Sequence, residues 1–266
     1  MKAYISIFIS TLVVITVVLA APSGARAQTE ITLLAPSPIR EPLEKSIAAF
    51  EAKTGDKVKV TWAVGSRDTE PYGTRQLVAR GQAQDVSIMF APFPEALASG
   101  NIDPKTATKI CGIVLALTVK KGAPIPDISS IAAVKKTLLS AKSIAIVEPK
   151  QGTLGQEGQA LLKQLGLGDQ LQSKIKAYDG SGQAEQAVAK GEAELFLGPQ
   201  ASDKLMAGLD LVMVGALPRD ASTPVDVVGF ISTHASDPKA ARLLLDSLKT
   251  ADAEAAYKAS KFQPAD

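Results

Sequence analysis

The feature that most constrains the fold is the alternation of short apolar stretches with amphipathic ones after residue 30. The apolar stretches are rich in β-branched residues, which is typical of strands, and the stretches between them repeat apolar residues at helical spacing. Strands that alternate with helices favour an α/β fold with parallel pairing and right-handed crossovers. The elements expected in this first series are strand 31–35, helix 41–54, strand 57–64, helix 74–80 and strand 85–90.

A second series of the same kind follows. It comprises helix 131–139, strand 143–147, helix 153–165, strand 174–178, helix 183–190 and strands 194–197 and 209–214. Long apolar runs at 110–119 and 225–232 stand at the joints, and helices 238–250 and 252–258 close the chain. We therefore predict two lobes: lobe 1 from residues 28–110 plus 225–266, and lobe 2 from residues 111–224. Ligand sites favour such interfaces, so a cleft between the lobes is expected.

The first 27 residues have the composition of a secretory signal peptide. Lys2 precedes an apolar stretch at 5–20, and an Ala-x-Ala site ends at Ala27. The alternative is an uncleaved membrane anchor, but the apolar stretch falls short of the roughly 20 residues that a spanning helix needs. We predict cleavage after Ala27 and a soluble mature protein. Cleavage removes two of the 29 basic residues, Lys2 and Arg26, and none of the 27 acidic ones, so the mature chain is formally neutral.

The composition excludes several classes of function. The chain has one His and one Cys, which cannot supply a tetrahedral zinc site or an iron–sulfur cluster and make a His-dependent catalytic triad improbable. Its near-neutral charge gives no general attraction for nucleic acid. The single Cys111 lies in an apolar run and is interpreted as a small buried hydrophobe. We expect no metal, no cofactor, no catalytic residue and no nucleic-acid partner.

Seven segments of the chain carry a resemblance to a known family: 31–37, 50–55, 65–66, 83–86, 190–194, 237–241 and 262–265. They resemble the corresponding segments of periplasmic molybdate-binding proteins of the type II periplasmic solute-binding superfamily. The resemblance implies an α/β receptor with a ligand cleft between two lobes. It also implies closure on an oxyanion such as molybdate or tungstate, delivery to the membrane permease of an ABC importer, and no chemistry of its own. We expect a periplasmic monomer.

Hydroxyls and helix N-termini are the candidate ligand groups. Unpaired N–H groups and the helix dipole favour an anion at a helix start. The resemblance assigns Ser37 and Ser66 to the two hydroxyl sites of the family, although either also suits a cap or turn. Arg67 departs from the family's short loop. Its guanidinium suits a carboxylate or other oxyanion, but it suits equally a pair with Asp68 or Glu70.

Two helix starts complete the expected site. At the first, the resemblance assigns a backbone donor at Leu154, and Thr153 adds a hydroxyl as ligand or N-cap. At the second, Ser181 lies in a Gly-rich turn and matches a further backbone donor, with an ordinary N-cap as the alternative. Replacing Ser37 or Ser66 by Ala is expected to weaken binding by about 1–3 kcal/mol with little change in stability.

The match to the molybdate family fails at one position. Where that family supplies a Tyr hydroxyl, this chain has Pro199, which has neither a side-chain donor nor an N–H; Gln200 is the candidate substitute. A missing donor is costly in a buried anion site, so a small carboxylate or another organic anion rivals molybdate. An exported enzyme, such as a deaminase or transferase relative, needs an acid–base group that the lone His234 does not supply. A third alternative is a module that senses a ligand and signals through a partner protein, and the sequence does not distinguish it from a transport receptor.

Overall fold

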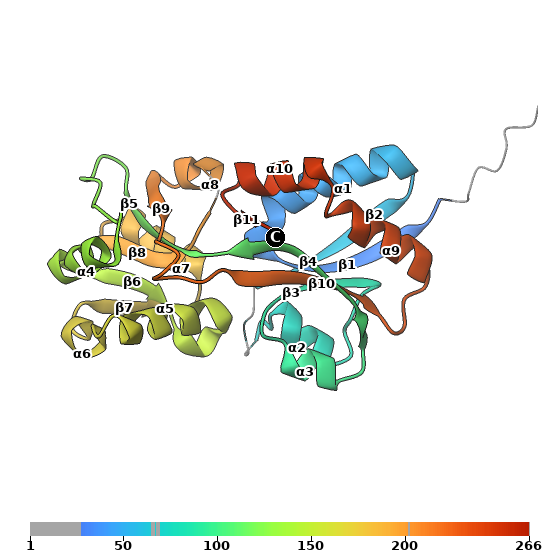
Figure 1. Ribbon diagram of the computed structural model, residues 1–266, viewed down its shortest axis with the longest axis horizontal. Helices are drawn as coiled ribbons and strands as arrows, with labels where there is room; N and C mark the ends of the chain where they lie inside the picture. Colours follow the sequence, from blue (N-terminus) through green and yellow to red (C-terminus); the bar gives the residue numbers. More distant parts are fainter. Residues whose placement is uncertain (1–27, 65–66, 68–69, 202, 266) are drawn as a thin grey trace, which may run out of the picture.

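The computed structural model describes residues 28–64, 67, 70–201 and 203–265. It contains two mixed sheets with helices packed on both, arranged as two lobes side by side (Figure 1). The two-lobed α/β fold is therefore confirmed. The expected signal peptide and Ser66 lie outside the described residues. Within them, no helix has the length and apolar character needed to cross a membrane.

The first lobe is built on a six-stranded sheet in the order β11-β4-β10-β3-β1-β2. β1 pairs in parallel with β2 and β3, whereas β10 runs antiparallel to β3 and β4. In Figure 1, α1, α9 and α10 cover one face of this sheet and α2 and α3 the other. The elements are β1 (Glu30–Pro36), η1 (Ser37–Ile39), α1 (Arg40–Thr54), β2 (Lys57–Ala63), α2 (Thr74–Ala79), β3 (Val86–Phe90), α3 (Pro94–Ala98), β4 (Ile102–Ile113), β10 (Val225–Ser232), α9 (Pro238–Ser247), α10 (Ala251–Ala259) and β11 (Gln263–Pro264).

The second lobe is built on a five-stranded sheet in the order β7-β6-β8-β5-β9. β6 pairs in parallel with β7 and β8, and β5 runs antiparallel to β8 and β9. The elements are β5 (Leu115–Lys120), α4 (Ile131–Ser140), β6 (Ile144–Val147), η2 (Pro149–Gln151), α5 (Thr153–Gln164), α6 (Gly168–Leu171), β7 (Ile175–Tyr178), α7 (Ser181–Ala189), β8 (Leu195–Pro199), α8 (Asp203–Gly208) and β9 (Leu211–Ala216).

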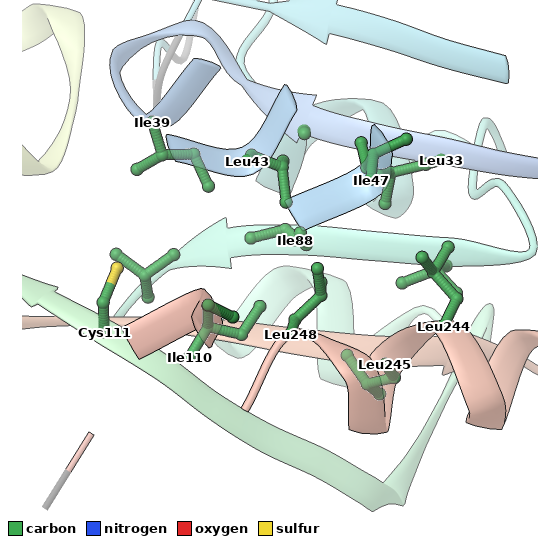
Figure 2. Packing of buried hydrophobic residues seen from close by; sticks show 14 of the residues in the cluster. Leu33, Ile39, Leu43, Ile47, Ile88, Ile110, Cys111, Leu244, Leu245 and Leu248 are labelled. Carbon is green, nitrogen blue, oxygen red and sulfur yellow. The ribbon is translucent and has the colours of Figure 1, made fainter. Parts of the chain in front are cut away.

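Sequence-local signals explain the elements around the first lobe's core. Helix α1 ends at Gly55, whose φ of 80° is the left-handed conformation that glycine adopts without strain. Strand β2 alternates exposed and half-buried residues along its length, as its sequence pattern predicted. Figure 2 shows Leu43 and Ile47 of α1 facing the sheet residue Ile88, with α9 leucines on the same buried layer.

Cys111 lies in this same core and is fully buried, as its apolar setting indicated. Burial raises the pKa of its thiol far above the ordinary range. The thiolate is the reactive form of cysteine, so this side chain acts as a small packing group.

The long apolar run at 110–119 crosses between the lobes, and it does so as two strands rather than as one continuous strand. The chain leaves the first sheet at Ile113 and enters the second at Leu115, with Val114 between them. Gln200, which follows β8, fixes this crossing, because its backbone N–H donates to Val114 O at 2.9 Å.

Helices α3, α6 and α8 and strand β11 were not expected from the sequence. The exact division at residues 111 and 225 stays our proposal.

Candidate functional site

A cavity of about 370 Å³ lies between the two lobes. That volume is in the range of sites for small organic ligands. The first lobe contributes the turn after β1, Val64 at the end of β2, and Arg67. The second lobe contributes the starts of α5 and α7 and the end of β8. The lining residues are Ser37, Pro38, Val64, Arg67, Val147, Gln151, Leu154, Gly155, Asp179, Gly180, Ser181, Gly182, Glu185, Pro199, Gln200 and Ala201.

Ser37 lines the cavity at the end of β1, as predicted, but its hydroxyl already has an acceptor. Its Oγ donates to Ala63 O at the end of β2, at 2.8 Å. A serine hydroxyl carries one proton, so Ser37 has to give up this bond before it donates to an anion. Ser37 therefore links two parallel strands in this conformation. Its replacement is expected to affect stability as well, which revises the prediction made from sequence.

Arg67 is half-buried in the cavity wall, and its backbone is held on both sides. Its N–H donates to Val64 O at 3.2 Å, and its carbonyl accepts from Gly73 N at 2.7 Å. Of the described residues that line the cavity, Arg67 is the one cation. It is therefore the group best suited to a ligand's negative charge. Asp68, the alternative partner considered for it, lies outside the described residues.

The start of α5 lines the cavity with Leu154 and Gly155, and a further glycine, Gly152, is its N-cap residue. Gly152, the N-cap residue, has a φ of 114°, which side-chain-bearing residues rarely adopt. A Cβ at Gly155 would lie 2.4 Å from Glu148 O, so only glycine allows this close contact with the preceding loop. The first N–H groups of a helix have no acceptor within it and favour an anion. The structure thus brings the Leu154 position to the cavity, as expected.

Thr153 does not line the cavity with Leu154. It is fully buried, and its Oγ1 accepts a hydrogen bond from Arg75 Nη1 at 3.3 Å. Arg75 belongs to α2 in the other lobe, where the same Nη1 donates to Pro92 O at 2.9 Å. The pair therefore connects the two lobes outside the cavity lining. Sequence reasoning missed Arg75; its signal was a position three residues from the buried Val78 on one helix.

Helix α7 presents Ser181, Gly182 and Glu185 to the cavity. The spacing i to i+4 places the first and last of these on one helix face. Glu185 is only 5% exposed, and burial raises its pKa to about 7. None of the described residues donates a hydrogen bond to its carboxylate or forms an ion pair with it. Sequence reasoning missed Glu185, although its position three residues before the buried Val188 was a signal that it faces inward.

Pro199 and Gln200 both line the cavity, at the place where the resemblance pointed to a lost donor. The side chain of Gln200 is largely engaged with the protein. Its Oε1 accepts from Val114 N at 3.3 Å, and its Nε2 donates to Lys261 O. Gln200 thus holds the crossing between lobes together with the C-terminal segment. This engagement weakens the case for Gln200 as a replacement ligand.

The described part of the chain holds no group of three or more His, Cys, Asp or Glu side chains placed to bind a metal ion. The cavity instead combines one guanidinium, two helix starts, one buried carboxyl group and several apolar side chains. Such a site suits a small anion with some apolar surface. His234 is exposed and lies outside this lining.

Comparison with known proteins identifies relatives of this chain. A family model described as bacterial extracellular solute-binding protein matches residues 31–263. An aconitate isomerase of a Pseudomonas species is 28% identical over 242 residues, which span 91% of this chain and 90% of that protein.

Solved structures show the same fold at low identity. The Azotobacter vinelandii periplasmic molybdate-binding protein has a TM-score of 0.70 and 21% identity, covering 89% of this chain and 100% of that one. The sulfate-binding protein of Mycobacterium tuberculosis has a TM-score of 0.69 and 18% identity, covering 90% and 88%. The family model matches most of the length of this chain, and the solved structures have the same fold. The chain therefore belongs to the bacterial extracellular solute-binding protein family.

Proposed function

We propose that this protein is an exported receptor that binds a small organic carboxylate between its lobes and presents it to the permease of an ABC importer. The observation that carries the proposal is the cavity between the lobes, with Arg67 on one wall and the starts of α5 and α7 on the other. A guanidinium and oriented N–H groups both favour a carboxylate. The mature protein is formally neutral, so binding depends on these local groups.

A carboxylate fits better than a tetrahedral oxyanion for two reasons. The cavity of about 370 Å³ holds on the order of ten water volumes, which leaves room beyond a single small oxyanion. Its wall also includes Val64, Val147 and Leu154, which suit a carbon skeleton. Pro199 offers no donor, and Gln200 is bound to the protein backbone. The relative named as an aconitate isomerase supports an organic acid as ligand.

Calorimetry against a panel of anions tests the proposal. The panel includes aconitate, citrate and succinate beside molybdate, tungstate, sulfate and phosphate. We expect saturable binding of at least one carboxylate. The variant Arg67→Gln should weaken that binding about 10- to 100-fold, because it removes a charge-assisted pair. Arg219→Gln, an exposed arginine outside the cavity, is the matched control and should change nothing.

Two outcomes contradict this assignment. Tight binding of molybdate or sulfate with no carboxylate bound would restore the tetrahedral oxyanion, the function that the resemblance first implied. Equal binding by Arg67→Gln and the parent protein would remove Arg67 from the site. Export is tested separately by the mass of the secreted protein, which we expect to begin at Gln28.

A further inference from the structure

Glu185 is the group in the cavity that simple anion binding does not use. Glu185 lines the cavity that a carboxylate ligand would occupy, and an ionised Glu185 would repel that ligand. A receptor needs only donors and cations there. Its placement on the second turn of α7, beside the ligand position, therefore calls for a role beyond binding.

We propose that Glu185 moves a proton between two carbon atoms of the bound carboxylate, so that the site isomerises its ligand as well as binding it. This inference rests on the proposed function. The substrate class is an unsaturated carboxylate with a C–H bond on the carbon next to its double bond. A buried carboxyl group in the wall of a ligand cavity that also holds a guanidinium is the arrangement that such a reaction requires.

The step needs no oxidant, reductant or co-reactant. The Glu185 carboxylate takes the proton as the C–H bond breaks, and that electron pair becomes the new double bond. The former double bond supplies the pair for a new C–H bond at the far carbon, which receives the proton back from Glu185. Negative charge that develops on the ligand's carboxylate is stabilised by Arg67 and by the N–H groups at the start of α5.

The surroundings of Glu185 suit a proton carrier. Burial raises its pKa to about 7, so both forms are populated near neutral pH. The other titratable side chains of the lining are Arg67 and Asp179, of which Asp179 is bound by Gln151 Nε2. The strands packed on α7 add only Lys120, Lys176 and Tyr178. Lys176 donates to Glu192 O at the surface, and burial is the cause of the Glu185 shift.

Hydrogen exchange provides the test. The mature protein is incubated with trans-aconitate in D2O at pH 7, and proton NMR follows deuterium entry and the cis isomer. We expect both from the parent protein, and at least 100-fold slower exchange from Glu185→Gln. Glu192→Gln, the same change at an exposed position outside the cavity, is the control and should exchange at the parent rate.

Binding of the saturated analogue propane-1,2,3-tricarboxylate, measured by calorimetry, separates folding and binding from chemistry. Glu185→Gln should keep this affinity within about tenfold. If the parent protein binds the analogue but neither exchanges nor isomerises aconitate, the inference fails and the receptor function stands. Exchange by Glu185→Gln at the parent rate would also overturn it. If no carboxylate binds, the proposed function fails and the inference fails with it.

Discussion

Asp85 in the first lobe and Glu185 in the second are buried carboxyl groups with opposite environments. Asp85 in the first lobe is 7% exposed, and Glu185 in the second is 5% exposed. Asp85 accepts four hydrogen bonds: from Thr32 N and Oγ1 at 2.8 and 2.6 Å, and from Ser236 N and Oγ at 2.7 Å each. Among the described residues, none donates to Glu185.

The pKa values move accordingly. Burial works to raise the pKa of Asp85, but its hydrogen bonds from Thr32 and Ser236 outweigh burial and lower the pKa. Burial acts alone on Glu185 and raises its pKa. A carboxylate satisfied by its own protein connects elements of the fold, here β1 with the loop before α9. A carboxyl group left without donors beside a cavity reduces stability and is available to a ligand.

The largest effect should come from Asp85→Asn. An amide offers an N–H₂ group to donors that need an acceptor, so we expect the free energy of unfolding at pH 7 to fall by about 2–4 kcal/mol. Urea denaturation measures it, with the exposed Asp220→Asn as the control. Because the folded pKa of Asp85 is lowered, this stabilisation is present above its unfolded pKa and is lost as pH falls through its folded pKa. A difference that persists unchanged at strongly acidic pH would contradict the assignment.

Glu185→Gln should raise the free energy of unfolding of the ligand-free protein, whereas Asp85→Asn lowers it. The folded pKa lies near 7 against an ordinary value of 4.5 for glutamate, so the folded state holds an extra proton between these pH values. Stability therefore falls as pH rises through this window. The variant should be more stable than the parent by about 2–3 kcal/mol at pH 8 and equal to it at pH 4, by denaturation at each pH. Destabilisation at pH 8 would show that Glu185 has partners after all.

Ser236→Ala sharpens the comparison by removing one of the four donors to Asp85. The backbone N–H of residue 236 still donates, so we expect a loss of about 1 kcal/mol in the free energy of unfolding. The pKa of Asp85 should rise, because fewer hydrogen bonds favour its ionised form. The loss of stability in acid, which we call the acid limb of the stability curve, should therefore begin at a higher pH. Thermal denaturation between pH 2 and 5 measures both effects, and an unmoved acid limb would count against the hydrogen-bond explanation.

Ser37→Ala should have the smallest effect on stability, about 0.5 kcal/mol, because it removes one hydrogen bond, to Ala63 O, from an exposed residue. Calorimetry with the bound carboxylate then decides what Ser37 does in the complex. Weaker binding shows that the hydroxyl turns toward the ligand, and unchanged affinity shows that Ser37 serves only the link between β1 and β2.

Much of the fold followed from local pattern. The period of apolar residues identified α1, β2, α5 and β10, and Gly55 marked the end of a helix through a conformation that glycine favours. The apolar run at 110–119 was expected at a joint between the lobes, but its division into two strands did not follow from local pattern, because Val114 at the break is bound by Gln200, which is 86 residues away. The cavity's helix starts were found from glycines and hydroxyls, which are local signals as well.

The sequence by itself determined the order of elements, the α/β class and the candidate anion donors, because helix caps and strand alternation depend on neighbours in the chain. Only the tertiary structure decided which polar groups are satisfied. Thr153 and Gln200 were candidate ligands, yet their partners are Arg75, Val114 and Lys261. Glu185 would be an ordinary solvated residue on an isolated helix. In the folded protein α7 packs on strands that include β5, β6 and β8, and burial raises the pKa of Glu185, which is the property that the proposed proton transfer uses.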